Sequence, residues 1–246
     1  MTALALLFAA ALWAGIQNAL AGGGTFLTLP ALMLTGMTAL SANITSTVAL
    51  FPGQVTSSWS GRAHVSGVGP LSFKAMVVIS LAGGVVGAIL LLVTPSSIFQ
   101  SMVPWLVLFA TTVFAWGSFG PKRETGHALN HIGAGVVQFL ISVYGGYFGG
   151  GIGFLMLAAL TAAGLAIRNA SATKNVLAGV MNASAVAIFV FSPQVHWLQA
   201  AIACVGAAIG GVIGGMMVSR VNQKVLRVAA VIIGIALTIG LFFKSP

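Results

Sequence analysis

The stretch Gly22-Gly23-Gly24 occurs again in the second half of the chain as Gly149-Gly150-Gly151. A second glycine-rich stretch, GGVVG at residues 83–87, recurs at the same separation as GGVIG at residues 210–214. The two kinds of stretch come in the same order in both halves of the chain. A duplicated apolar chain interrupted by glycine is typical of secondary transporters, in which the substrate site lies where two repeats meet.

The composition excludes a soluble domain. Hydrophobic residues make up 59% of the 246 residues and charged residues only 4%, whereas soluble domains carry about 25% charged residues. Uncharged stretches close to the roughly 20 residues that a spanning helix needs occur at residues 75–93, 98–119, 175–191, 197–219 and 228–243. The period-2 alternation of a membrane β-barrel is missing. The sequence therefore predicts an all-α integral membrane protein.

The net charge of +9 does not indicate a nucleic-acid partner, because the ten basic residues are scattered near the ends of predicted helices. The single cysteine, Cys204, lies in an apolar run and allows neither a disulfide framework nor a cysteine metal site. We expect no cofactor and no metal. Residues 1–14 lack the basic start of a signal peptide, so we expect them to belong to the mature first repeat.

The two halves have the same predicted organisation. Residues 1–119 form a first transmembrane repeat, residues 120–127 a cytoplasmic linker, and residues 128–246 a second transmembrane repeat. Each repeat begins with a glycine-broken stretch and continues with three ordinary spans. The broken stretches are residues 2–36 and 131–164, and the spans are residues 41–60, 71–93 and 97–119, then 169–191, 197–219 and 224–243.

Basic residues mark the cytoplasmic ends of membrane helices. The residues that serve as marks are Arg62, Lys74, Lys122, Arg123, Arg168, Lys174, Arg220, Lys224 and Arg227, while the terminal Lys244 falls on the other side. They fall on one side only if each glycine-broken stretch re-enters the membrane as a hairpin of two half-helices. Each repeat then crosses three times, so the second repeat is inverted relative to the first and both termini face outward.

The glycine triplets predict helix breaks, with second half-helices that begin at Thr25 and Ile152. Such breaks are tolerated in a bilayer only where protein or a wet cavity surrounds them, and a helix N-terminus attracts anions. The predicted binding residues at the breaks are Gly23, Gly24, Thr25, Gly150 and Gly151. The alternative is that these glycines only allow close helix packing.

Polar residues gather at the start of the span that follows each break. The predicted substrate-binding residues there are Asn43, Thr45, Ser46 and Gln54 in the first repeat and Thr173, Lys174, Asn175 and Asn182 in the second. Gln54 pairs with Asn182, and Asn43 with Asn175, as amides at matched places. The alternative role is hydrogen bonding between helices, worth about 0.6–2 kcal/mol per contact.

Lys174 breaks the symmetry, because its counterpart in the first repeat is the neutral Ser46. An ionisable residue within a membrane indicates function. The alternative is that Lys174 lies at the cytoplasmic interface with its ammonium in water.

Glu124 is the only acidic residue, and it lies in the predicted linker. Proton or sodium coupling through a membrane carboxylate is therefore excluded, while coupling through His64, His131 or His196 stays open. A site without acids suits an anion rather than a cation. An anion leaving a negative-inside cell gains about 2.3 kcal/mol per charge and 100 mV, so a uniporter could export it without a coupling ion, and the sequence does not identify one. The missing acids also argue against an enzyme.

Four runs of residues resemble the two signatures of the sulfite exporter TauE/SafE family. They are GGGTFLTLP at residues 22–30 with ANITST at residues 42–47, and YGGYFGGGIG at residues 144–153 with ATKN at residues 172–175. The resemblance extends over essentially the whole chain. It implies a multi-pass inner-membrane protein of two repeats that exports sulfite, organosulfonates such as sulfoacetate, or other small sulfur-containing anions. It also implies that Thr173, Lys174 and Asn175 are the first-choice site.

These observations predict a secondary transporter that exports small anions by alternating access around a midplane site between the repeats. Two alternatives remain open at this point, an anion channel and a non-transport membrane subunit of a partner complex. The expected partners are a small anion and the lipid bilayer. A homodimer is also compatible with the sequence, because lipid-facing and partner-facing residues look alike.

Overall fold

The computed structural model describes residues 2–20, 23–61, 65–69, 71–119, 131–217 and 223–244 as an all-helical protein. Within these ranges the only β-structure is an isolated bridge between Val68 and Leu71. Several residues of the sequence predictions lie outside the described residues: Gly22, Arg62, His64, Arg220 and the linker at residues 120–127 with Lys122, Arg123 and Glu124.

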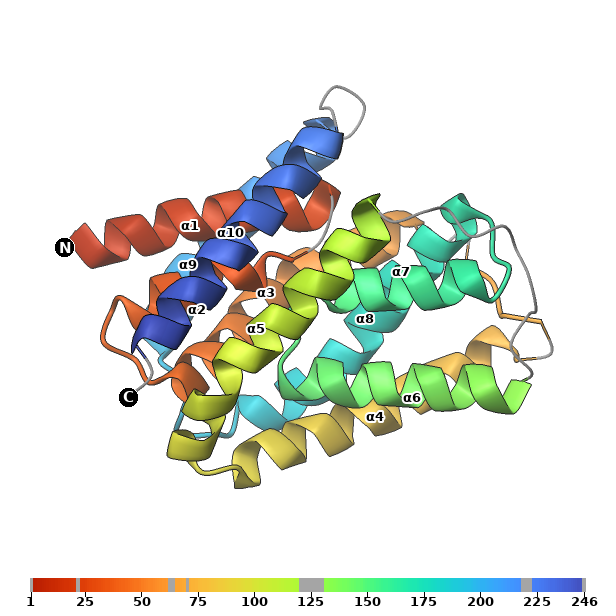
Figure 1. Cartoon of the computed structure of the whole chain (residues 1–246), viewed down its shortest axis with the longest axis horizontal. Helices are drawn as coiled ribbons and strands as arrows, with labels where there is room; N and C mark the ends of the chain where they lie inside the picture. Colours follow the sequence, from red (N-terminus) through yellow and green to blue (C-terminus); the bar gives the residue numbers. More distant parts are fainter. Residues whose placement is uncertain are drawn as a thin grey trace.

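The helices follow the same order in both halves of the chain (Figure 1). A long helix is followed by a short helix and then by three long helices. The first half contains α1 (Thr2–Leu20), α2 (Thr25–Met33), α3 (Ala39–Gly61), α4 (Phe73–Val93) and α5 (Ser96–Phe119). The second half contains α6 (His131–Tyr147), α7 (Ile152–Ala162), α8 (Ile167–Phe189), α9 (Trp197–Met217) and α10 (Gln223–Lys244).

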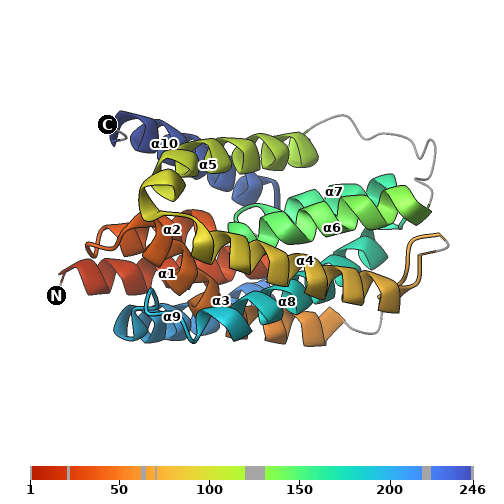
Figure 2. The ribbon, with the colours of Figure 1, turned by 90° about the horizontal axis from the view of Figure 1, so that it is seen from below.

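Each glycine-broken stretch folds as a helical hairpin. The hairpin of α1 and α2 is entered from the end of the bundle where α1 begins, and α2 returns toward that end (Figure 2). The hairpin of α6 and α7 is entered from the opposite end and returns there. Helices α2 and α7 are short, and both begin within the bundle (Figure 1). The short helices begin at Thr25 and Ile152, the two residues at which the sequence predicts them.

The long helices pack mainly against helices of the other half. Helix α1 lies along α9 and α6 lies along α4, while α3 packs on α8 in the middle of the bundle and α5 packs on α10. Glycines allow two of these close approaches. A Cβ atom on Gly210 of α9 would overlap the carbonyl oxygen of Leu12 on α1, and one on Gly87 of α4 would overlap the carbonyl oxygen of Val143 on α6.

The outer surface of the bundle is apolar. All five tryptophans are exposed, with Trp116 at 72% and Trp59 at 67%, whereas the largest buried side chains are phenylalanines such as Phe99 and Phe148. Among the described residues, four helical segments are long and apolar enough to cross a membrane: Phe73–Val93, Ser96–Trp116, Asn169–Phe189 and Trp197–Gly214. An exposed apolar surface of this extent needs lipid as its solvent.

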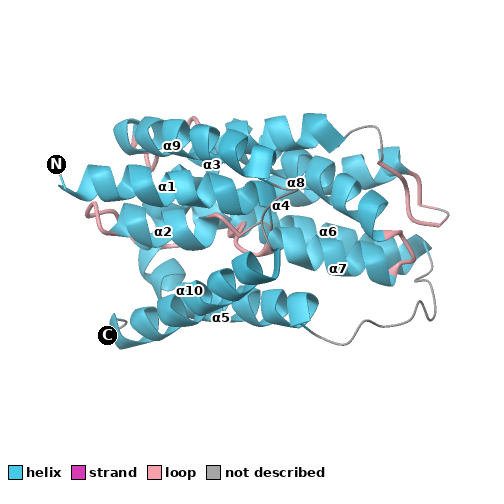
Figure 3. Cartoon of the chain, turned by 90° about the horizontal axis from the view of Figure 1, so that it is seen from above, coloured by secondary structure: helices cyan, strands magenta, loops and turns pink. Residues whose placement is uncertain are grey.

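The two chain ends lie at one end of the bundle. Helix α1 begins and α10 ends there, and the turn between α4 and α5 lies at the same end (Figures 2 and 3). Helices α4 and α8 begin toward the opposite end, and α10 begins near the middle of the view and runs back to the end where α1 begins (Figure 2). Of the described basic residues, Lys74, Arg168, Lys174, Lys224 and Arg227 lie near the starts of these three helices, whereas Lys244 is the last residue of α10.

Candidate functional site

The two hairpin turns depend on glycines with a left-handed backbone. Gly23 has φ +87°, and Gly149 and Gly151 have φ +74° and +73°. Other L-residues adopt this conformation at a cost of about 1–2 kcal/mol, which explains why both turns are rich in glycine. The N-cap residues are Gly24 for α2 and Gly151 for α7.

One backbone N–H group of the first hairpin turn is hydrogen-bonded within the protein. The backbone N–H of Gly24 donates to Oδ1 of Asn18 at 2.8 Å. The side chain of Gln17, only 2% exposed, lies beside Gly23. The backbone N–H of Gly24, which the sequence analysis assigned to an anion, is therefore hydrogen-bonded within the hairpin in this conformation.

The second turn has a different internal bond. The hydroxyl of Tyr144, on the last turns of α6, donates to the carbonyl oxygen of Gly150 at 3.0 Å. This bond ties an oxygen of the turn and uses none of its N–H groups. The N-terminal turn of α7 keeps the positive dipole end that attracts anions.

The ammonium of Lys174 lies at this N-terminal turn. Lys174 is a half-buried residue of α8, and a Cβ atom built on Gly153 would lie 3.7 Å from its Nζ. Gly153 is the second residue of α7. A lysine charge and a helix N-terminus therefore meet at the second hairpin, an arrangement that suits a small anion.

The first hairpin has the matching contact without the charge. Ser46 of α3, the counterpart of Lys174, is fully buried and its hydroxyl lies 2.6 Å from the hydroxyl of Thr28 on α2. Both position 46 and position 174 therefore contact the short helix of their own hairpin.

Gln54 and Asn182 meet in the middle of the bundle. Nδ2 of Asn182 on α8 donates to Oε1 of Gln54 on α3 at 2.6 Å, so two amides at matched positions of the two halves bond to each other. Asn182 is 3% exposed. Its Oδ1 is buried and has no hydrogen-bond partner among the described residues.

The other predicted amide pair is separated. Nδ2 of Asn43 donates to the carbonyl oxygen of Tyr147, at the end of α6, at 3.0 Å. The backbone carbonyl of Asn175 accepts from the hydroxyl of Ser58 at 2.8 Å. Asn43 thus joins the first half to the second hairpin turn, and Asn175 joins α8 to α3.

Thr45 and Thr173 are fully buried and bind loops instead of facing a cavity. The hydroxyl of Thr45 accepts the N–H of His196 at 3.2 Å, and the hydroxyl of Thr173 accepts the N–H of Ser66 at 3.0 Å. The two threonines lie in the second turns of α3 and α8, which begin at opposite ends of the bundle (Figure 2). The predicted site residues are therefore spread along the bundle rather than gathered around one point.

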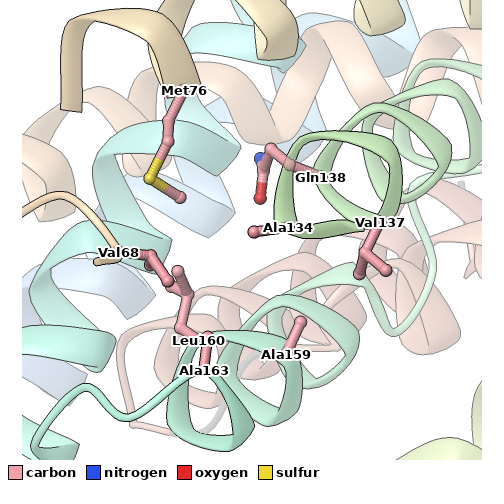
Figure 4. Close-up of a pocket in the computed structure, with 8 residues that line it drawn as sticks. All are labelled: Val68, Met76, Ala134, Val137, Gln138, Ala159, Leu160 and Ala163. Carbon is pink, nitrogen blue, oxygen red and sulfur yellow. The ribbon is translucent and has the colours of Figure 1, made fainter. Parts of the chain in front are cut away.

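Two cavities lie near the ends of the bundle. An open cavity of about 390 Å³ is lined by the start of α3, the ends of α4 and α8, and the loop residues Ser192, Pro193 and Gln194. A second cavity of about 10 Å³, room for one water molecule, lies between α4, α6, α7 and Val68 (Figure 4). Its one polar lining side chain, Gln138, donates to the hydroxyl of Ser80 at 2.8 Å.

Sequence reasoning missed the loop partners Ser66 and Gln194 and the hydroxyl of Ser41. Ser41 donates to Oε1 of Gln194 at 2.5 Å. Ser66 and Gln194 lie in short loops, where single serines and glutamines are ordinary, and Ser41 lies in the first turn of α3. The signal that could have revealed them is their spacing, because the separation of Ser66 from Gln194 along the chain equals that of Thr45 from Thr173.

The helical fold and the apolar outer surface define a multi-pass membrane protein. The family described as "Sulfite exporter TauE/SafE" matches residues 7–241 of the chain. This protein therefore belongs to the sulfite exporter TauE/SafE family, a family of membrane transporters.

Curated relatives match along nearly their whole length. A "Probable membrane transporter protein ORF9" of Sinorhizobium sp. is 32% identical over 247 residues, which cover 97% of this chain and 92% of the relative. A "Probable membrane transporter protein" of Haemophilus influenzae is 27% identical, with 98% and 95% covered. The "Probable membrane transporter protein YfcA" of Escherichia coli K12 is 28% identical, with 98% and 90% covered. No solved structure gives a significant match.

Proposed function

We propose that this protein exports small anions, sulfite or organosulfonates such as sulfoacetate, across the inner membrane. The observation that carries the proposal is the ammonium of Lys174 at the N-terminal turn of α7. Two positive features converge there on a hairpin turn inside the bundle. The chain's only acidic residue, Glu124, belongs to the predicted linker, so the predicted spans carry no carboxylate that would repel an anion.

The anion loses water at this site and needs donors in exchange. The N-terminal turn of α7 beyond Gly150 and Gly151 supplies backbone N–H groups, and Lys174 supplies charge. Asn175 follows on the same helix, and the Gln54–Asn182 pair lies deeper in the bundle. The matched residues of the first repeat, with the turn at Gly23, Gly24 and Thr25, complete the path.

We further propose that the halves form an inverted repeat that works by alternating access. Three observations support this arrangement. The two hairpins enter from opposite ends of the bundle (Figure 2), and the helix order repeats. The first helix of each half also packs on a helix of the other half, α1 on α9 and α6 on α4. Such pairing lets one half rock against the other around a central site.

The test is flux through purified protein in liposomes. Sulfite and sulfoacetate efflux is measured with and without an imposed potential, for the wild-type protein, for Lys174→Ala and for the control Lys74→Ala. Lys74 is exposed at the start of α4. Lys174→Ala should reduce flux about tenfold or more, the loss expected when a hydrogen-bonded charge is removed, and Lys74→Ala should leave it unchanged.

Other outcomes point to other functions. Currents far faster than a carrier's turnover would indicate an anion channel. No flux of any tested anion by wild-type protein, under any gradient, would overturn the proposal and favour a non-transport membrane subunit. Equal loss of flux in both lysine variants would remove Lys174 from the site.

A further inference from the structure

Two hydrogen-bonded contacts between the halves are matched at opposite ends of the bundle. We call them the Thr45 latch and the Thr173 latch. In the Thr45 latch, the hydroxyl of Thr45 accepts the N–H of His196 at 3.2 Å and donates to the carbonyl oxygen of Gln194 at 3.5 Å. In the Thr173 latch, the hydroxyl of Thr173 accepts the N–H of Ser66 at 3.0 Å and donates to its carbonyl oxygen at 3.3 Å.

The two latches join equivalent positions of the two halves. Each buried threonine lies in the second turn of α3 or α8, and each bonds the loop that precedes α9 or α4. The two threonines are as far apart along the chain as the loop residues Ser66 and Gln194 are. Each latch therefore joins a helix of one half to a loop of the other half. The Thr45 latch lies near the start of α3 and the Thr173 latch near the start of α8, and α3 begins at the end where α1 begins whereas α8 begins at the opposite end (Figure 2).

We propose that the two latches are the gates of the transport path and open in turn; this inference rests on the proposed function. A movement of one half against the other at one end must break the latch at that end, while the latch at the far end can persist. Both latches are closed in this structure. Exchanging the conformations of the two halves exchanges which latch is open, as alternating access requires.

The chemistry of the latches suits gates. Their bonds join neutral hydroxyl and backbone groups, which gain little net free energy compared with charged pairs, so anion binding can open them in each cycle. Ser41, which donates to Oε1 of Gln194 at 2.5 Å, adds one more neutral bond at the Thr45 latch. The open cavity of about 390 Å³ that Gln194 helps to line gives this loop space to move into.

The first experiment measures access to the centre and needs no flux. A reporter cysteine replaces Asn182 in a Cys204→Ala protein, and a membrane-impermeant thiol reagent is applied to right-side-out and to inside-out vesicles. Thr45→Val should speed labelling about fivefold from the end where α1 begins, the population shift expected when a hydrogen bond of ordinary strength is lost. Thr173→Val should do so from the opposite end.

A matched control removes a buried hydroxyl that joins the halves elsewhere. Ser80 is fully buried and accepts from Gln138 between α4 and α6, so Ser80→Ala should leave labelling unchanged from both ends. If neither threonine variant changes labelling, or if each changes it equally from both ends, the latches are not gates.

The second experiment locks each latch. The cysteine pairs Ser41→Cys with Gln194→Cys, and Ser66→Cys with Thr173→Cys, are joined by a short bis-methanethiosulfonate reagent. Joining either pair should reduce anion flux at least about tenfold, and reductant should restore it. Full flux with a joined pair would overturn the proposal. Absence of flux in the unjoined and wild-type proteins would instead contradict the proposed function, while the labelling experiment would still decide the gates.

Discussion

Position 174 carries a lysine where the matched position 46 carries a serine, although both contact the short helix of their own hairpin. The contact with the short helix is therefore repeated, while the charge is not. In the proposed function, an anion attracted to Lys174 meets the second hairpin first, and the neutral Ser46 offers it only a hydroxyl. We interpret the first half as the scaffold and the second half as the part that selects the charge of the substrate.

The Gln54–Asn182 pair can bind an anion in the proposed function because donor and acceptor of its hydrogen bond can exchange roles. In this structure Asn182 donates to Gln54 and leaves its own Oδ1 buried with no partner among the described residues. If both side-chain amide groups rotate by about 180°, Gln54 donates to Asn182 instead, and Asn182 presents an NH2 group to the same buried space. Neither Asn43, whose amide is fixed by the carbonyl of Tyr147, nor a hydroxyl bound to a loop has this freedom.

The Gln54–Asn182 pair predicts different effects for two buried amides. Asn182→Ala and Gln138→Ala each remove a buried amide that bonds across the halves, so each should lower the free energy of unfolding by about 1 kcal/mol. Only Asn182→Ala should raise the half-saturating anion concentration, about fivefold. Thermal unfolding and concentration-dependent flux measure the two quantities. Equal half-saturation in both variants would make the central pair a packing contact alone.

At the scale of the elements, the hairpins were predictable and the helix partners were not. Glycine triplets break helices for backbone reasons that a sequence displays, so the starts of α2 and α7 at Thr25 and Ile152 could be predicted. The pairing of α1 with α9 could not, because lipid-facing and helix-facing residues are equally apolar. The polar candidates Thr45 and Thr173 were found, but their partners are backbone groups of loops, for which the repeated spacing of Ser66 and Gln194 is a weak sequence signal.

Two adjacent glycines of α9 should respond differently to the same substitution. A Cβ atom on Gly210 would overlap the backbone of Leu12 on α1, whereas one on Gly211 would meet nothing within 4 Å. Gly210→Ala should therefore cost about 1–3 kcal/mol of stability through overpacking. Gly211→Ala should be neutral or slightly stabilising, because alanine favours a helix. Melting temperatures in detergent measure both, and equal values would show that α1 and α9 do not pack as closely as described.

At the scale of the whole molecule, the distribution of basic residues and the direction of the hairpins agree. The turn before α5 and the loop before α9 lie at the end where α1 begins and α10 ends (Figures 2 and 3). Neither carries Lys or Arg. The opposite end has Lys74 and the basic start of α8, and Lys224 and Arg227 lie at the start of α10, away from the chain termini; Lys244, at the end of α10, is the exception. By the positive-inside rule this opposite end is cytoplasmic, so we expect both chain termini to face outward.

Labelling of single cysteines in intact cells tests this topology. In a Cys204→Ala background, Ser97→Cys and Pro193→Cys should react with a membrane-impermeant maleimide, whereas Lys74→Cys and Ala166→Cys should react only after permeabilisation. All four positions are exposed at an end of the bundle. If each glycine-broken stretch instead crossed the membrane once, an extra crossing would separate residue 97 from residue 193, and these two cysteines would label from opposite sides. The pair therefore distinguishes an inverted repeat with re-entrant hairpins from eight successive crossings, because only the inverted repeat puts both positions outside.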